Sequence, residues 1–118
     1  MYSPIVLDHF HNPRNVGPLD GATHSGTAGS PGDGPHMIIE LEVSDGMICG
    51  AAYQTYGCPA AVACGSIVAQ IVQGRSVDTA AKITAEDVIL LLGGLPEGKH
   101  HLAALCTSAL TKALEGTN

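Results

Sequence analysis

The chain has 118 residues, of which 45% are hydrophobic and 14% charged, a balance typical of one globular domain and not of a disordered segment. Its formal charge of −6 argues against a nucleic-acid backbone as a partner. No apolar run reaches the roughly 18 residues of a membrane span, and no signal peptide is visible, so we expect a cytoplasmic protein.

The N-terminal half predicts a short helix followed by a small antiparallel sheet. Residues 2–12 have the pattern of a helix, which Asn12-Pro13 should end. Asp45-Gly46 favours a hairpin turn, and a loop is expected over residues 29–35. Three strands are therefore expected, around residues 22–28 and over residues 37–43 and 47–56.

The C-terminal half predicts helices. Gly74 is a natural C-cap, and Thr84 with Asp87 has the form of a capping box. The expected helices cover residues 60–73, 84–92 and 99–114. Strands first and helices after indicate an α+β fold over residues 1–118, with helices packed on one face of a three-stranded sheet.

Cys58 lies where a strand-like run ends at Gly57 and an apolar helical run begins at Pro59. A thiol at a helix N-terminus meets unpaired backbone N–H groups and the helix dipole, and both favour the thiolate that binds metals and attacks sulfur. Free cysteine is also among the most buried residue types. Because Gly57 and Pro59 mark an exposed turn, we favour a sulfur-handling role for Cys58.

Two loop segments offer further metal ligands. Asp33 is either part of an ordinary turn or a carboxylate able to bind a metal. His100 and His101 are either solvated or supply an imidazole to Cys58 or to a shared metal, since Zn²⁺ and iron accept mixed ligand sets. The remaining histidines have no spacing that marks a site: His9, His11, His24 and His36.

The other three cysteines are spaced too widely for a CxxC zinc or redox motif. Cys64 and Cys106 each share an apolar helical stripe, so we expect both to pack in the core as small hydrophobic residues. Cys49 follows the predicted hairpin turn, and we assign it no role.

Four stretches of this chain together resemble the family of iron–sulfur cluster assembly scaffolds, IscU and the N-terminal domain of NifU. The stretches are residues 8–17, 29–37, 55–58 and 95–102. The resemblance covers nearly the whole chain and implies an IscU/SufE-like fold. It implies a scaffold or carrier role in cluster assembly and no enzymatic activity.

Members of that family hold a cluster, or Zn²⁺, with three cysteines, an aspartate and a histidine. The first cysteine position falls on Asp33 here, and the aspartate position falls on Pro35. The second cysteine is Cys58 and the histidine is His101, both retained, whereas the third cysteine position falls on Leu102. The resemblance therefore implies a site with one of the three usual thiolates.

Asp33, Cys58 and His101 are the ligands that this resemblance implies, for a two-iron cluster or for a single zinc or iron ion. Cys106, one helical turn beyond Leu102, or a second copy of the chain in a homodimer would supply a further ligand. Two alternatives remain open: a persulfide relay that uses Cys58 alone, and a regulatory or structural paralogue without cluster chemistry.

The resemblance also implies partners. A cysteine desulfurase is the expected sulfur donor. The family binds an Hsp70-type chaperone through a Leu-Pro-Pro-Val-Lys segment, which here is Leu95-Pro96-Glu97-Gly98-Lys99. Since Glu97 and Gly98 remove stiffness and apolar contact, we do not expect chaperone binding through this segment.

Overall fold

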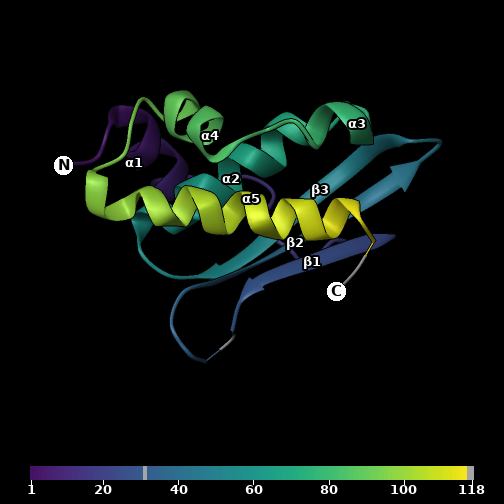
Figure 1. Cartoon of the computed structure of the whole chain (residues 1–118), viewed down its shortest axis with the longest axis horizontal. Coiled ribbons are helices and arrows are strands. Elements are labelled where there is room, and N and C mark those ends of the chain that lie inside the picture. The colour runs from purple at the N-terminus through teal and green to yellow at the C-terminus, as the bar shows by residue number, and fades with distance from the viewer. Residues whose placement is uncertain (31, 117–118) are drawn as a thin grey trace.

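The computed structural model describes residues 1–30 and 32–116, and Pro31 of the predicted loop and residues 117–118 of the predicted domain lie outside them. Figure 1 shows helices over a small sheet, which confirms the predicted α+β class. The elements are α1 (Pro4–His11), β1 (His24–Gly29), β2 (His36–Ser44), β3 (Met47–Tyr56), α2 (Pro59–Val72), α3 (Val77–Ala80), α4 (Ala85–Leu91), the 3₁₀ turn η1 (Glu97–Lys99) and α5 (His100–Leu114). Within the described residues, no helix is long and apolar enough to cross a membrane.

The sheet has the order β1-β2-β3 with antiparallel neighbours. The predicted alternation in β2 is confirmed, since Met37, Ile39 and Leu41 are fully buried. The first strand is shifted from the predicted 22–28 to His24–Gly29, because Gly29 still pairs with His36 at the end of β2. The hairpin at Asp45-Gly46 is confirmed, with both residues at positive φ.

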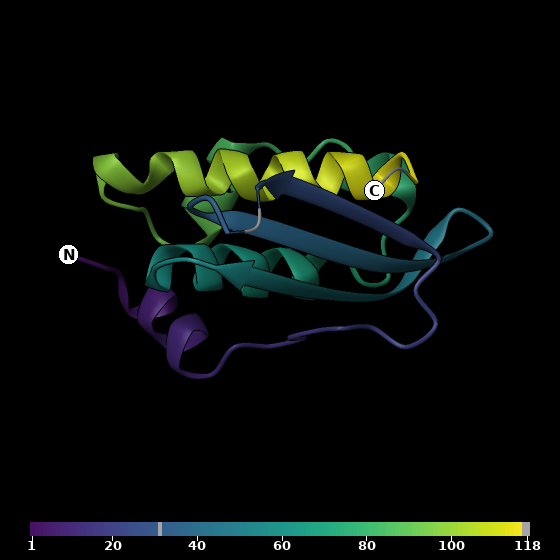
Figure 2. The ribbon, with the colours of Figure 1, turned by 90° about the horizontal axis from the view of Figure 1, so that it is seen from below.

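Both long helices pack on the same face of the sheet. Helix α2 lies against β3, α5 lies against β1 and β2, and α4 packs on α5 and α2 as an outer element. In Figure 2 the strands lie in front of α2 and α5, which places the core between sheet and helices. The contact is close: a Cβ atom at Gly26 would overlap the α5 backbone at Ala109 and Ala113.

Residues 12–22 cross from α1 to the outer edge of β3. Tyr53 donates its backbone N–H to Asn15 at 3.0 Å and accepts the N–H of Gly17 at 2.8 Å, so the segment pairs with the free edge of that strand. Figure 2 shows this segment running beside β3. The pairing covers an edge that would otherwise expose unpaired backbone groups.

Candidate functional site

Cys58 is the N-cap residue of α2, as its sequence context predicts. Its extended backbone, with φ −81° and ψ 176°, makes the turn between β3 and the helix, and Pro59 occupies the first helical position. The residue is half-buried, in contrast to the fully buried Cys64 and Cys106. This position places the thiol at the positive end of a helix of 14 residues.

Four neighbouring groups stabilise the thiolate of Cys58. Partial burial raises the pKa of the thiol. The backbone N–H groups of Ala61 and Ala60, the positive charge of Lys99 and the hydroxyl of Tyr2 act in the opposite direction, and the net pKa is below the ordinary value for cysteine. Such an environment is typical of a reactive, metal-binding thiol and not of an inert one.

The interaction with Cys58 also changes the pKa of Tyr2. Burial raises the pKa of its phenol, and so do the nearby charge of Cys58 and the hydrogen bond to it. The phenol therefore stays protonated and donates to the sulfur. Neither Tyr2 nor Lys99 was identified from the sequence, since each lies far from Cys58 along the chain and only the fold brings them together.

The prediction that Cys64 and Cys106 pack in the core is confirmed. Both are fully buried, and burial raises the pKa of Cys64 to about 12 and that of Cys106 well above its ordinary value. The hydroxyl of Tyr53 is buried near Cys106 and has a pKa of about 12, again because of burial. These groups are neutral at physiological pH. Because Cys106 is also fully buried, it is not available as a ligand beside Cys58.

Asp33 and His101 are both on exposed surface. Asp33 lies on the loop between β1 and β2, flanked by Gly32 and Gly34 at positive φ, and its N–H donates to Ser30 at 3.0 Å. His101 lies in the first turn of α5. Across residues 1–30 and 32–116, no three His, Cys, Asp or Glu side chains lie together as a set that could hold a metal ion. The expected set of Asp33, Cys58 and His101 is thus not gathered in this structure.

The segment before α5 is held against the protein. Leu95 packs against the core, and its carbonyl oxygen lies 2.9 Å from Nε2 of His100. Glu97 to Lys99 form the turn η1, in which Lys99 donates its N–H to Pro96 at 2.8 Å. Lys99, the last residue of this turn, lies near enough to Cys58 for its positive charge to act on the thiol.

Comparisons with known proteins point to one family. The profile of the NifU-like N terminal domain matches residues 1–116. The iron-sulfur cluster assembly scaffold protein IscU 1 of Archaeoglobus fulgidus is 43% identical over 114 residues, which are 97% of this chain and 74% of that protein. The iron-sulfur cluster assembly scaffold protein IscU of Escherichia coli strain K12 is 39% identical, over 96% of this chain and 91% of its own length.

A solved structure shares the fold. The N-terminal part of a nitrogen-fixing NifU-like protein from Brucella abortus superposes with a TM-score of 0.74 at 20% identity. The match covers 97% of this chain and 92% of that one. The two proteins therefore share the same overall fold.

Proposed function

We propose, since the chain belongs to the family of NifU-like N-terminal domains, that it is a scaffold or carrier protein in iron–sulfur cluster assembly and not an enzyme. The names of its relatives favour this role over a sulfur relay alone or a regulatory paralogue. The structural observation that carries the proposal is the half-buried cysteine at the N-terminus of α2, Cys58, whose pKa lies below the ordinary value. We propose that the protein acts in the cytoplasm.

In the proposed mechanism, sulfur is transferred to the protein before iron binds. The thiolate of Cys58 attacks the outer sulfur of a persulfide on a cysteine desulfurase, a new S–S bond forms, and the thiolate of the donor leaves. The Tyr2 hydroxyl and the Lys99 ammonium hold the attacking sulfur in its anionic form before the step. The product is a persulfide on Cys58. Its outer sulfur enters the cluster as sulfide only after an external reductant, such as a dithiol, supplies two electrons, which releases sulfide and restores the Cys58 thiolate.

Iron is the second component that the protein binds in this mechanism. Cys58 is the thiolate donor, and Asp33 and His101 are the supporting ligands of a two-iron cluster or of a single iron or zinc ion. To form this set, the exposed side chains of Asp33 and His101 must approach the sulfur. The neutral thiol of Cys106 is buried in the core and adds nothing to the set without a change in packing.

The desulfurase is the one partner that this mechanism requires. We propose no chaperone contact through Leu95–Lys99, because Leu95 already packs on the core and Glu97–Lys99 are folded into the turn η1. The negative net charge favours a partner with a basic surface.

Anaerobic reconstitution tests the proposal. The protein is incubated with Fe²⁺, cysteine, a cysteine desulfurase and a dithiol reductant, and bound iron and sulfide are measured together with the visible absorption of a cluster. The wild-type protein should retain both elements, whereas Cys58→Ser should lose them. Cys49→Ser, which changes an exposed cysteine on β3, is the matched control and should behave as wild type. Equal iron and sulfide in the wild type and in Cys58→Ser would contradict the proposal.

A further inference from the structure

Ser3 joins two helices that are far apart in the chain. Its hydroxyl group donates a hydrogen bond to the carbonyl oxygen of Leu92, the C-cap residue of α4. The same hydroxyl oxygen accepts the backbone N–H of Val6 at 3.1 Å, which makes Ser3 the N-cap of α1. The residues that precede α1 are therefore fixed to the end of α4.

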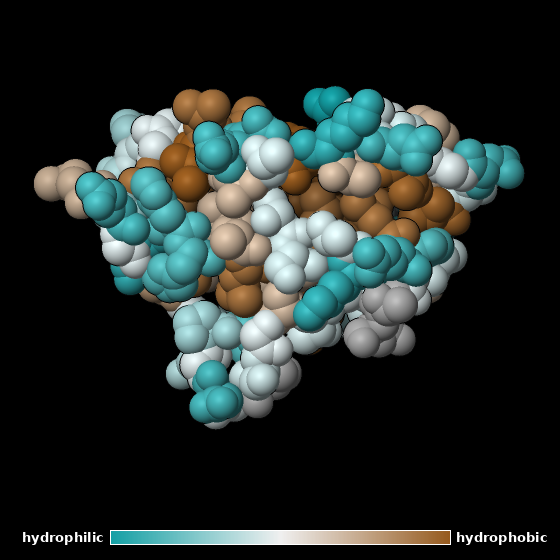
Figure 3. Space-filling model, viewed as in Figure 1, coloured by the Kyte–Doolittle hydropathy of each residue, from teal (hydrophilic) through white to brown (hydrophobic). Residues whose placement is uncertain are grey.

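The end of α4 is a firm anchor for this bond. The helix packs on α5 and α2, and Val88 and Leu92 on its inner side are fully buried. Its outer side faces solvent: Leu90 is 76% exposed, and Figure 3 shows apolar surface gathered over this helix. Gly93, directly after the C-cap, also lies against Ser3, since a Cβ atom added to it would be 3.4 Å from the Cβ of Ser3. Ser3 thus meets a part of α4 that packing holds in place.

Tyr2 is the residue next to Ser3, and it reaches Cys58. Both Tyr2 and Cys58 are half-buried and pack against the core, and the Tyr2 hydroxyl forms a hydrogen bond with the sulfur. Figure 2 shows the N-terminus at the end of the molecule where α2 and α5 begin. Because the hydroxyl must touch the sulfur to donate to it, the phenol occupies part of the approach to the thiol.

We propose that Ser3 is a positioning residue, which fastens residues 1–3 to α4 as a strap and so keeps the side chain of Tyr2 over the sulfur of Cys58. The strap also has an open arrangement, in which Tyr2 leaves the sulfur and a large sulfur donor can meet the thiol. The hydrogen bond from Ser3 to Leu92 stabilises the covered arrangement. Ser3 therefore controls access to the sulfur without touching it.

The strap gives Cys58 a selectivity by size that the exposed thiol of Cys49 lacks. A small reagent passes beside the phenol, whereas a large one requires the strap to open. The proposal rests on the proposed function in one respect, since Cys58 is the thiol that accepts sulfur there. Its test needs neither a desulfurase nor iron, so the strap can fail while sulfur transfer holds, and the reverse.

Labelling with two maleimides of different size tests the proposal. N-Ethylmaleimide is small, and a maleimide joined to a long polyethylene glycol chain is bulky. Both react with the thiolate, so the ratio of the bulky to the small rate at one cysteine reports access and not the pKa of the thiol. The thiols left free are then alkylated in denaturant, and mass spectrometry of peptides measures how much of each cysteine remained. In the wild-type protein this ratio should be lower at Cys58 than at Cys49.

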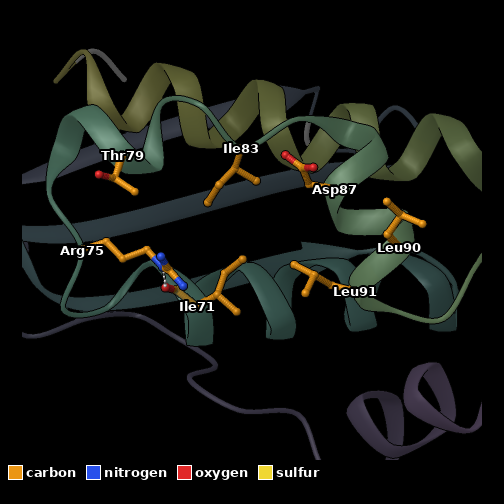
Figure 4. A pocket seen from close by; sticks show the side chains of 7 residues that line it. All are labelled: Ile71, Arg75, Thr79, Ile83, Asp87, Leu90 and Leu91. Carbon is orange, nitrogen blue, oxygen red and sulfur yellow. Dashed lines mark hydrogen bonds between the residues drawn. The ribbon is translucent and has the colours of Figure 1, made fainter.

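Ser3→Ala should raise the ratio at Cys58 by about two- to tenfold, the factor that the loss of one hydrogen bond of ordinary net strength gives. Ser3→Thr keeps the hydroxyl and should keep the wild-type ratio. Ser76→Ala is the matched control, because Ser76 caps α3 in the same way and accepts the N–H of Thr79 at 3.1 Å. Figure 4 shows Thr79 across a surface hollow from Leu91, the last residue of α4. Ser76→Ala should therefore lose a cap and leave the ratio unchanged.

Tyr2→Ala tests whether Ser3 acts through Tyr2. It should raise the ratio at Cys58 at least as much as Ser3→Ala does, and Ser3→Ala should add nothing to it in the double variant. Ser3→Gly repeats the test with a residue that an N-cap tolerates, in case Ser3→Ala does not fold. A wild-type ratio at Cys58 equal to that at Cys49, or an unchanged ratio in the folded Ser3 variants that lack the hydroxyl, would overturn the proposal. A further increase in the double variant would overturn it as well.

Discussion

The Nδ1 atom of His9 and the hydroxyl oxygen of Ser66 lie 2.7 Å apart in the interior, where they join α1 to α2. The backbone N–H of Arg14 donates to the same hydroxyl oxygen at 2.9 Å. The hydroxyl proton is therefore free to point at His9, which accepts it as a neutral imidazole. This buried hydroxyl therefore connects α1 and α2 to the start of the segment that leads from α1 to the sheet edge.

Acid should destabilise the protein through His9. Burial lowers its pKa, and so does the positive charge of Arg14. Because the folded pKa lies below the unfolded value of about 6.5, the unfolded state binds more protons, and the stabilisation is lost as the pH falls below that value. Denaturant unfolding at a series of pH values should show this loss.

His9→Gln is the matching variant for the pH experiment, and it should have a lower free energy of unfolding at neutral pH by about 1–3 kcal/mol, because the proton of the buried Ser66 hydroxyl loses its acceptor at Nδ1 of His9. Its stability should fall less steeply with acid than that of wild type. His101→Gln changes an exposed histidine and should keep the wild-type slope. The same slope in His9→Gln as in wild type would assign the acid sensitivity to other groups.

Tyr2 and Lys99 should set the reactivity of Cys58. The rate of alkylation by iodoacetamide follows the thiolate fraction, so its pH profile reports the pKa of the thiol. The midpoint for Cys58 should lie below the ordinary value for cysteine, and Tyr2→Phe or Lys99→Gln should each raise it. Lys82→Gln removes a similar charge that has no part in the site and should leave the midpoint unchanged. An unchanged midpoint in both Tyr2→Phe and Lys99→Gln would show that neither group acts on the sulfur.

The buried thiols should not react with a thiol reagent while the protein is folded. A thiol reagent under native conditions should modify Cys58 and the exposed Cys49, because Cys64 and Cys106 are fully buried and neutral. Mass spectrometry of peptides should find modification of the latter pair only after unfolding. Native labelling of Cys106 at a rate near that of Cys58 would mean that α5 opens, and Cys106 would then be available as a ligand.

Gly65→Ala should destabilise the protein although alanine normally favours a helix. A Cβ at Gly65 would overlap the ring of Tyr53, which is buried and cannot move outward. Overpacking costs about 1–3 kcal/mol, against about 1 kcal/mol gained from helix propensity, so the net free energy of unfolding should fall. Gly98→Ala, where a Cβ meets open space, is the control for thermal unfolding and should be neutral. An equal or higher melting temperature for Gly65→Ala would mean that the ring adapts.

Local patterns were enough to predict most of the elements. The capping box of Thr84 and Asp87 is confirmed with both hydrogen bonds, at 2.9 and 3.1 Å. Gly74 takes a positive φ directly after the C-cap of α2. Helix α3 was missed because four residues show no apolar period, and Ser76, its N-cap, was the only local signal.

The environment of Cys58 could be predicted only in part. Its place at a helix N-terminus follows from Gly57 and Pro59, which are sequence neighbours. The interactions with Tyr2 and Lys99 depend on how the residues before α1 and the turn η1 pack, and no spacing rule encodes that. His9 likewise had no spacing that marks a role, because its partner Ser66 becomes a neighbour only when α1 packs on α2.

For the predicted metal ligands, the sequence could not predict how far apart their side chains lie. The resemblance identified Asp33 and His101 by position, but position does not fix the separation of their side chains from Cys58. Both lie on exposed surface, where no packing holds them toward the sulfur. Whether they bind metal stays a prediction that the reconstitution experiment tests.

The most direct test of the account is to locate the sulfur that the protein accepts. The protein is incubated with a cysteine desulfurase and cysteine without iron, and mass spectrometry of the intact chain and of its peptides identifies the modified residue. We predict one added sulfur atom on the peptide that contains Cys58, and none on the Cys58→Ser variant. Sulfur on Cys49, Cys64 or Cys106, or an equal gain by Cys58→Ser, would contradict the assignment of Cys58 as the accepting thiolate.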